Sequence, residues 1–152
     1  MFETIDQSFI KKILKERGMN KGEVEEFLNP IYIEEKGGMY DARKMKDIDK
    51  AIARIWTAID NNEKIGIYSD YDADGVPGAV VFHSFFKKIK FDSNVIIKIP
   101  HRHKDGFGLH THLLDELKEE GVTLVITIDL GSSNVEQVNH ANSLGIDVII
   151  TD

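Results

Sequence analysis

Three aspartates alternate with other residues in the segment DYDADG, residues 70–75, namely Asp70, Asp72 and Asp74. Carboxylates within a few ångströms of one another raise one another's pKa, so an ionised cluster is stable only beside a cation. Oxygen ligands without sulfur favour Mg²⁺, Mn²⁺ or Ca²⁺, and a neighbouring imidazole favours Mn²⁺ or Mg²⁺. Two such ions about 3.5–4 Å apart would activate a water molecule and stabilise the leaving oxygen in phosphoester hydrolysis.

Polar residues also follow the other β-rich runs of the sequence. The four runs span residues 64–70, 95–100, 123–129 and 147–152, and they lead into DYDADG, PHRH, the DLG that begins at Asp129, and Asp152. Open α/β sheets bind ligands at the carboxyl ends of their strands. If the runs are parallel strands, these acids and basic residues meet at one edge of the sheet.

Helical patterns separate the runs, at about residues 76–88, 113–119 and 135–144. Gly121 and Gly145 stand where the second and third of these helices should end. Continuous apolar strands alternating with helices are typical of a parallel sheet covered by helices on both faces. The sequence therefore predicts an α/β fold with such a sheet.

A different pattern precedes residue 64. Apolar residues recur at helical spacing around Phe9–Leu14 and Ile48–Ile59, and Asn20 is a plausible N-cap for a short helix that Pro30 closes. Gly37-Gly38 predicts a loop. We expect a helical leader over residues 1–63 and an α/β domain over residues 64–152 that is incomplete at its carboxyl end.

Composition excludes several classes of protein. The 152 residues contain 41% hydrophobic and 30% charged residues, enough for one domain with a core, and no apolar run long enough for a membrane span. No secretory signal is present, so we expect a cytoplasmic protein without membrane partners. The absence of cysteine removes disulfides and thiolate metal sites. The net charge of −7 argues against a basic nucleic-acid-coating surface.

Each motif also has an ordinary structural explanation. DYDADG matches the opening of an EF-hand loop, but position twelve is Val81 instead of Glu and a strand precedes the loop. Asp and Gly are common turn and N-cap residues. His101-Arg102-His103-Lys104 alone would be a solvated charge run, whereas beside three aspartates Arg102 is better suited to bind phosphate.

The loop after the basic run offers features suited to a nucleotide. Gly106 and Gly108 give a flexible backbone that could approach a ligand, and Phe107 could stack on a base or serve in packing. The remaining histidines lie in helical stretches, where surface or capping roles are the default; they are His83, His110, His112 and His140.

Together these motifs resemble the DHH phosphoesterase superfamily: DYDADG, PHR…GFGL, TIDLGSSN, and ITD where a D-H-H triplet begins. The leader resembles that of the RecJ-like single-stranded-DNA exonucleases in RGM at residues 17–19, EEFLNP at 25–30 and MYDARKMKDIDKAIARI at 39–55. The resemblance covers essentially the whole chain.

The resemblance implies site residues and a cofactor, Mn²⁺ or Mg²⁺ in a two-metal site. Asp72, Asp74 and Asp129 would hold the ions, Asp70 would be a further ligand or its partner, and Asp152 would be the D of DHH. His101 and Arg102 would contact or position the phosphate. Related members often carry a histidine where this chain has Tyr68, and Asp70 would compensate for it.

The resemblance also implies a function, 5′-to-3′ hydrolysis of single-stranded DNA in repair and recombination. Its partners would be single-stranded DNA and a single-strand-binding protein or other repair factors. By this resemblance, both histidines of DHH, a later carboxylate and the DHHA1 domain would lie beyond Asp152. We therefore expect the longer parent to be the nuclease and this piece alone to be inactive or nearly so.

Two alternatives remain and a third can be set aside. Members of the superfamily also hydrolyse small substrates such as nanoRNA or cyclic dinucleotides, although the helical leader favours the exonuclease. A non-catalytic relative would be a scaffold of a replication or repair complex, but such relatives lose the aspartates that this chain keeps. A plain nucleotide-binding domain lacks support because the sequence contains neither G-x-G-x-x-G after the first strand nor a P-loop motif.

Overall fold

The computed structural model describes residues 7–30 and 41–152. The chain forms two compact units, which divide between Lys46 and Asp47. In the first unit, helices α1 (Gln7–Glu16) and α2 (Lys21–Leu28) precede a short 3-10 helix, η1 (Ala42–Lys44). The glycine pair expected to mark a loop, residues 37–38, lies outside the described residues.

Helix α2 begins with a complete capping box. The Asn20 side chain accepts hydrogen bonds from the backbone N–H groups of Gly22 and Glu23, at 2.9 and 3.1 Å. In return, the Glu23 carboxylate accepts the N–H of Asn20 at 2.7 Å. These bonds satisfy amides that a helix leaves without internal partners, and they confirm the predicted N-cap.

The second unit contains a parallel sheet of four strands in the order β2-β1-β3-β4. Its elements are α3 (Ile48–Asp60), β1 (Lys64–Ser69), α4 (Gly75–Lys88), the 3-10 helix η2 (Asp92–Asn94), β2 (Val95–Lys98), α5 (Thr111–Glu119), β3 (Val122–Ile128), α6 (Val135–Ser143) and β4 (Asp147–Thr151). Each predicted strand is present and ends one or two residues before its expected last residue.

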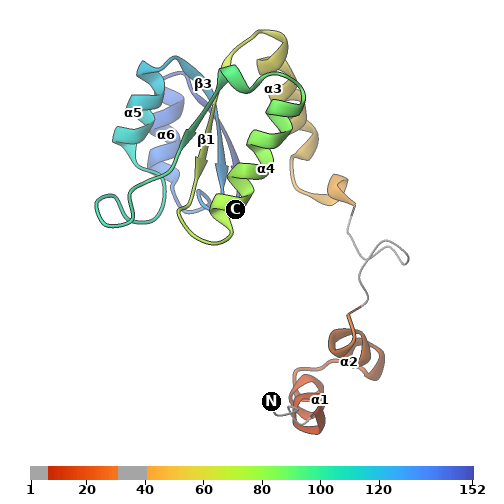
Figure 1. The fold of residues 1–152 in the computed structure, drawn as a ribbon. Coiled ribbons are helices and arrows are strands. Elements are labelled where there is room, and N and C mark those ends of the chain that lie inside the picture. Colours follow the sequence, from red (N-terminus) through yellow and green to blue (C-terminus); the bar gives the residue numbers. More distant parts are fainter. Residues whose placement is uncertain (1–6, 31–40) are drawn as a thin grey trace. The chain divides into compact units, whose positions relative to one another are not determined.

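Helices cover both faces of this sheet, as predicted. Figure 1 shows α3 and α4 on one face and α5 and α6 on the other. Leu114 and Val125 belong to the core under α5 and α6, whereas Phe86 and Ile126 belong to the core under α3 and α4. Strands β1 and β3 are buried almost throughout, which explains why their sequences are continuously apolar.

Helix α3 has the helical pattern of the leader but lies in the second unit. Ala58 is fully buried in the same core as strands β1 and β3, and Ile55 and Ile59 pack against that core. The division between the compact units therefore falls before α3, whereas the change in sequence pattern falls after it, at Lys64.

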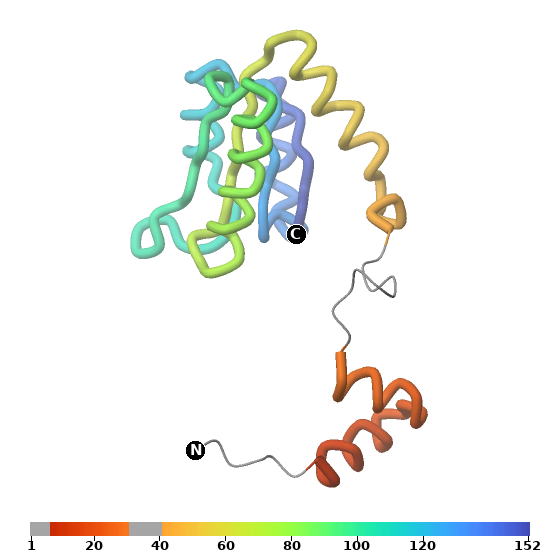
Figure 2. Tube along the Cα trace, turned by 45° about the vertical axis from the view of Figure 1, so that its right-hand side comes forward, coloured from red at the N-terminus to blue at the C-terminus, as the bar shows by residue number. Residues whose placement is uncertain are grey.

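The order of the strands creates a switch point between β1 and β3. The chain leaves β1 through α4 on one face and leaves β3 through α6 on the other face. Figure 2 shows that the loops after β1 and β2 and the end of β4 lie at the same edge of the sheet. Loops that diverge in this way open a crevice at the carboxyl ends of the strands.

Glycines end two of the helices as expected. Gly121 follows α5 with φ of +87°, and Gly145 follows α6 with φ of +73°. Only glycine adopts this left-handed conformation without strain from a Cβ atom. Among the helices of the two described ranges, none is both long and apolar enough to cross a membrane.

Candidate metal centre

Asp70 begins the aspartate-rich loop directly after β1. It is 2% exposed, and its N–H donates to the carbonyl of Ile128 at 3.2 Å, which continues the pairing of β1 with β3. Its Oδ1 accepts the N–H of Tyr71 at 2.7 Å. A buried carboxylate is costly unless its charge is compensated, so the position of Asp70 already points to a cation or a network of hydrogen-bond donors.

The aspartate loop ends at Gly75, where the backbone of Asp70 leaves no room for a side chain. A Cβ atom there would lie 2.6 Å from the carbonyl oxygen of Asp70, which is backbone and cannot rotate away. Gly78, one turn further along α4, would place its Cβ 2.6 Å from Cγ2 of Ile128. The two glycines let α4 start close against the end of the sheet, which keeps the loop tight around its aspartates.

Asp72 and Asp74 differ in what they do for helix α4. Oδ1 of Asp72 accepts the N–H of Gly75 at 3.2 Å and that of Asp74 at 3.4 Å, so Asp72 caps the loop. Asp74 occupies the N-cap position yet makes no side-chain hydrogen bond to the helix backbone. The ordinary N-cap interpretation therefore accounts for Asp72 and leaves Asp74 without an explanation as a helix cap.

Asp129 follows β3 in an unusual conformation. Its φ is +59°, in the left-handed region, and its N–H donates to the carbonyl of Thr151 in β4 at 2.8 Å. Aspartate tolerates this region better than most residues, but the conformation costs free energy and is concentrated at functional positions. It turns the chain sharply where β3 meets the switch point.

These loops bring three carboxylates together. Asp70, Asp72 and Asp129 each offer an oxygen atom, and these atoms lie within 4.8 Å of one another. Partial desolvation, followed by the nearby carboxylates of Asp74, Asp72 and Asp70, holds the pKa of Asp129 above its usual range. Hydrogen bonding from Gly75 and interaction with Asp74 hold the pKa of Asp72 below its usual range.

The donor set fits a hard divalent cation. It consists of carboxylate oxygens on two adjacent strand ends, which suits Mg²⁺ or Mn²⁺. Desolvation and the neighbouring carboxylates raise the pKa of Asp129, and a bound cation would offset both effects. No ion pair to these three acids occurs within residues 7–30 and 41–152.

Two predicted ligands lie outside the group of three. Asp74 is exposed and sits close enough to Asp129 to raise its pKa. Asp152 is exposed at the end of β4, and its Oδ2 accepts the N–H of Ser132 at 2.8 Å. This bond ties the ends of β3 and β4 together. The roles of both as ligands stay predictions.

The predicted phosphate-binding residues lie in the loop after β2. His101 and Arg102 are exposed, and the turn that holds them is closed by the His101 N–H, which donates to Oδ2 of Asp105 at 2.6 Å. The guanidinium of Arg102 lies over the ring of Tyr71, 4.4 Å from its centre. This contact brings the loop after β2 against the aspartate loop after β1.

The glycines of the same loop adopt conformations that require glycine. Gly106 and Gly108 have φ of +81° and +101°. Phe107 between them is 62% exposed, which disfavours its alternative role in packing. Its side chain is therefore accessible to a ligand, as the stacking hypothesis requires.

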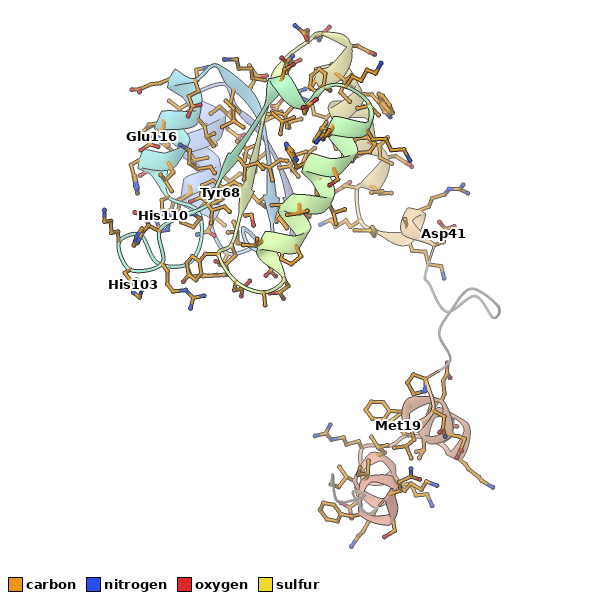
Figure 3. The ribbon with its side chains drawn as sticks, in the orientation of Figure 1. Met19, Asp41, Tyr68, His103, His110 and Glu116 are labelled. Carbon is orange, nitrogen blue, oxygen red and sulfur yellow. The ribbon has the colours of Figure 1, made fainter. Side chains whose placement is uncertain are left out.

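Tyr68 does not substitute for a histidine ligand. It is fully buried in the core under α5 and α6, on the side of the sheet where Figure 3 labels His110, and its hydroxyl donates to the carbonyl of Gly108 at 3.3 Å. Burial raises the pKa of the Tyr68 hydroxyl. Tyr68 thus anchors the glycine loop, while Asp70 joins the carboxylate group.

Asn134 is a residue of the site region whose role the sequence did not reveal. Its Oδ1 accepts the N–H of Leu109 at 3.3 Å, and its side chain would lie 3.2 Å from a Cβ at position 108. It thereby holds the loop after β2 against the loop after β3. Its place at the end of TIDLGSSN was the available signal, but its partner is 25 residues away in the sequence.

Comparison with known proteins agrees with this geometry. The family described as "DHH family, N-terminal domain" matches residues 64–152. The single-stranded-DNA-specific exonuclease RecJ of Bacillus subtilis is 42% identical over 113 residues, which are 74% of this chain and 14% of that protein. RecJ of Salmonella typhimurium is 33% identical over 115 residues, 76% of this chain and 20% of that protein.

Solved structures show the same fold. A crystal structure of exonuclease RecJ bound to manganese superimposes with a TM-score of 0.64 at 30% identity, over 71% of this chain and 27% of that one. RecJ from Thermus thermophilus in complex with Mn²⁺ gives 0.59 at 26% identity, over 72% of this chain and 15% of that one. With the aspartates at the switch point, these matches establish that the chain belongs to the DHH family and is RecJ-like within it.

Proposed function

We propose that this chain is part of a metal-dependent exonuclease that hydrolyses single-stranded DNA from its 5′ end. The observation that carries the proposal is the convergence of Asp70, Asp72 and Asp129 at the switch point of the sheet. The two curated relatives above are single-stranded-DNA-specific exonucleases, and the chain spans 14% and 20% of their lengths. The activity is therefore assigned to the longer protein, and these residues alone should be inactive or nearly so.

The aspartates hold the cofactor in this proposal. Asp72, Asp74 and Asp129 bind Mn²⁺ or Mg²⁺, and Asp70 and Asp152 are further ligands. Such ions supply Lewis acidity and allow water to ionise near neutral pH. The burial of Asp70 and the hydrogen bond from Gly75 to Asp72 fix two carboxylates before any substrate binds. Fixed groups of this kind need little reorganisation during the reaction.

The loop after β2 binds the substrate in this proposal. Arg102 neutralises a non-bridging phosphate oxygen, because its planar guanidinium matches phosphate geometry, and His101 beside it helps to position the phosphate. Phe107 stacks on a base while Gly106 and Gly108 let the backbone approach the nucleotide. The high exposure of Phe107 and the contact of Arg102 with the aspartate loop support these roles.

The negative net charge of the chain does not prevent DNA binding in this proposal, because the local charge at the site decides the interaction. The chain carries a net charge of −7, but cations in the aspartate cluster would make its surroundings positive. We include in the proposal a role in DNA repair and recombination, a cytoplasmic location, and cooperation with a single-strand-binding protein or other repair factors. Binding of the longer protein to a purified single-strand-binding protein would test the last of these.

A cleavage assay tests the activity. This chain and a longer version that extends through the missing histidines and carboxyl-terminal domains are incubated with Mn²⁺ and single-stranded DNA. A label at the 5′ end should appear at once in the smallest product, and a label at the 3′ end should remain in gradually shortened strands. We expect cleavage by the longer protein only. A longer protein that binds Mn²⁺ but cleaves neither the 5′-labelled nor the 3′-labelled DNA would contradict the proposal. That result would favour the small-substrate phosphodiesterase or the scaffold.

A further inference from the structure

Arg102 is held at the candidate site by one contact. Within residues 7–30 and 41–152, its guanidinium makes no ion pair or hydrogen bond, and the residue is exposed. Its partner is the ring of Tyr71, whose centre is 4.4 Å from Cζ. A cation over an aromatic face at this distance is attracted by the negative face of the ring.

Tyr71 is placed by the aspartate loop itself. It lies between Asp70 and Asp72 in the sequence, and its N–H donates to the carboxylate of Asp70 at 2.7 Å. The ring is partly buried, so it has fewer accessible orientations than an exposed tyrosine. The same short segment therefore fixes two carboxylates and an aromatic platform.

The other side of the contact is also fixed. The N–H groups of Lys104 and Asp105 donate to the carbonyl of His101 at 3.0 and 2.9 Å, and the His101 N–H donates to Asp105. The Asp105 carboxylate also lies 3.3 Å from Nε2 of His112 in α5. The backbone around Arg102 is thus a closed turn, and the remaining freedom lies in the long Arg102 side chain.

We propose that Tyr71 is a positioning residue, which holds the guanidinium of Arg102 against the loop that carries Asp70 and Asp72, in readiness for a phosphate. The inference rests on the proposed function and deepens it, since it adds a residue between the two motifs. An arginine left in water samples many rotamers and loses them on binding phosphate, whereas a stacked arginine has lost most of them beforehand. Stacking also keeps the guanidinium edge, which carries the hydrogen-bond donors, open to a ligand.

A double-mutant cycle in the longer protein tests the positioning role. Tyr71→Leu should lower kcat/KM for single-stranded DNA about two- to fivefold, the range expected for one cation–π contact at a partly exposed site. Tyr71→Phe keeps the aromatic face and should restore kcat/KM. In an Arg102→Met background, Tyr71→Leu should have no further effect, because no guanidinium is left to position. An equal loss in both backgrounds would overturn the inference, as would no loss in either.

A second measurement examines the contact without any activity. In the 152-residue chain, the ring current of Tyr71 should displace the NMR signals of the Arg102 side chain, and Tyr71→Phe should retain this displacement while Tyr71→Leu abolishes it. Signals that are identical in all three proteins would overturn the stacking. If the ring-current displacement is present but the longer wild-type protein cleaves no DNA, the proposed function fails while the contact that underlies the inference stands.

Discussion

Carboxylates at the two edges of the sheet differ in their partners. At the amino ends of the strands, Glu63 and Asp147 are both paired with Arg54, at 2.7 and 2.6 Å. At the carboxyl ends, Asp70, Asp72 and Asp129 are brought within 4.8 Å of one another. In the described ranges no lysine, arginine or histidine forms an ion pair with them.

The pKa shifts follow this difference. Hydrogen bonding from Thr123, reinforced by Arg54, holds the pKa of Glu63 below its usual range at the amino edge. At the carboxyl edge, desolvation and neighbouring carboxylates hold the pKa of Asp129 above its usual range. At the amino edge the ionised form of Glu63 is therefore favoured, whereas at the carboxyl edge the ionised form of Asp129 is disfavoured when no cation is present, even though hydrogen bonding lowers the pKa of Asp72 beside it. The contrast supports the proposal that the carboxyl edge is the part of the domain that binds a ligand.

Removing a carboxylate from the metal centre should have the largest effect. Asp129→Asn keeps a residue that tolerates the left-handed backbone but removes the charge, so the longer protein should lose Mn²⁺-dependent cleavage by about a thousandfold or more. Asp74→Ala should also abolish turnover. The rate of release of labelled nucleotides measures both. Cleavage that persists in either variant would remove that aspartate from the site.

An aspartate of the other edge provides the matched control. Asp147→Asn breaks the contact with Arg54 and should leave cleavage by the longer protein within about twofold of wild type, because the residue lies at the opposite ends of the strands. If Asp147→Asn abolished cleavage as well, the distinction between the two edges would not hold.

Gly75→Ala should be the most destabilising of the substitutions that change no charge. Its Cβ would lie 2.6 Å from a backbone oxygen of Asp70, so the loop must shift, at a cost of about 3 kcal/mol in the free energy of unfolding. Chemical denaturation of the chain measures this. Gly106→Ala is the control, because its Cβ would meet nothing within 4 Å and only the φ of +81° is unfavourable, which costs about 1–2 kcal/mol.

The amino edge should make stability depend on pH. Because the pKa of Glu63 is lowered on folding, its contribution is fully present above its ordinary value of 4.5 and is lost as the pH falls through the lower value of the folded state. Arg54→Met should destabilise the chain by about 1–2 kcal/mol at pH 7, a range reduced for partial exposure. The loss should shrink as the pH falls below 4.5, and a loss that is constant with pH would contradict this origin.

Removing the Tyr68 hydroxyl, which anchors the glycine loop, should have the smallest effect on stability. Tyr68→Phe removes one long hydrogen bond, 3.3 Å to the carbonyl of Gly108, and keeps the buried ring. We expect a loss of about 0.5–1 kcal/mol in the free energy of unfolding, measured by denaturant titration. A loss several times larger would mean that the loop after β2 is stabilised chiefly through this hydroxyl.

Much of the fold could be predicted because its signals are local. The runs that became β1 and β3 are continuously apolar, as strands buried on both faces must be, and Asn20, Gly121 and Gly145 mark helix ends by their own conformational preferences. Helix α3 shows where such reasoning stops. Its apolar spacing gives a helix, but only the tertiary structure assigns that helix to the α/β unit.

The carboxylate residues of the site could be predicted from the sequence, whereas the contacts that position the site residues could not. Topology alone implies that strand ends converge, so Asp70, Asp72 and Asp129 could be expected together. The stacking of Arg102 on Tyr71 joins residues 31 positions apart, which no local pattern encodes. The cap formed by Asp72 was also hidden, because the sequence makes Asp72 and Asp74 equally plausible caps. Only the structure shows that the carboxylate of Asp72, and not that of Asp74, accepts the N–H of Gly75.

In the proposed function, the carboxyl edge of the sheet is a divalent-cation site. Thermal unfolding of the 152-residue chain, followed with increasing Mn²⁺, tests it directly, since a ligand that binds the folded state raises the Tm. We predict that Mn²⁺ raises the Tm of the wild type and of Asp147→Asn but not that of Asp129→Asn. Without the ion, Asp129→Asn should be at least as stable as the wild type, because a repelled charge is gone. An equal rise in Tm for Asp129→Asn, or no rise in the wild type, would show that the carboxyl edge is not such a site.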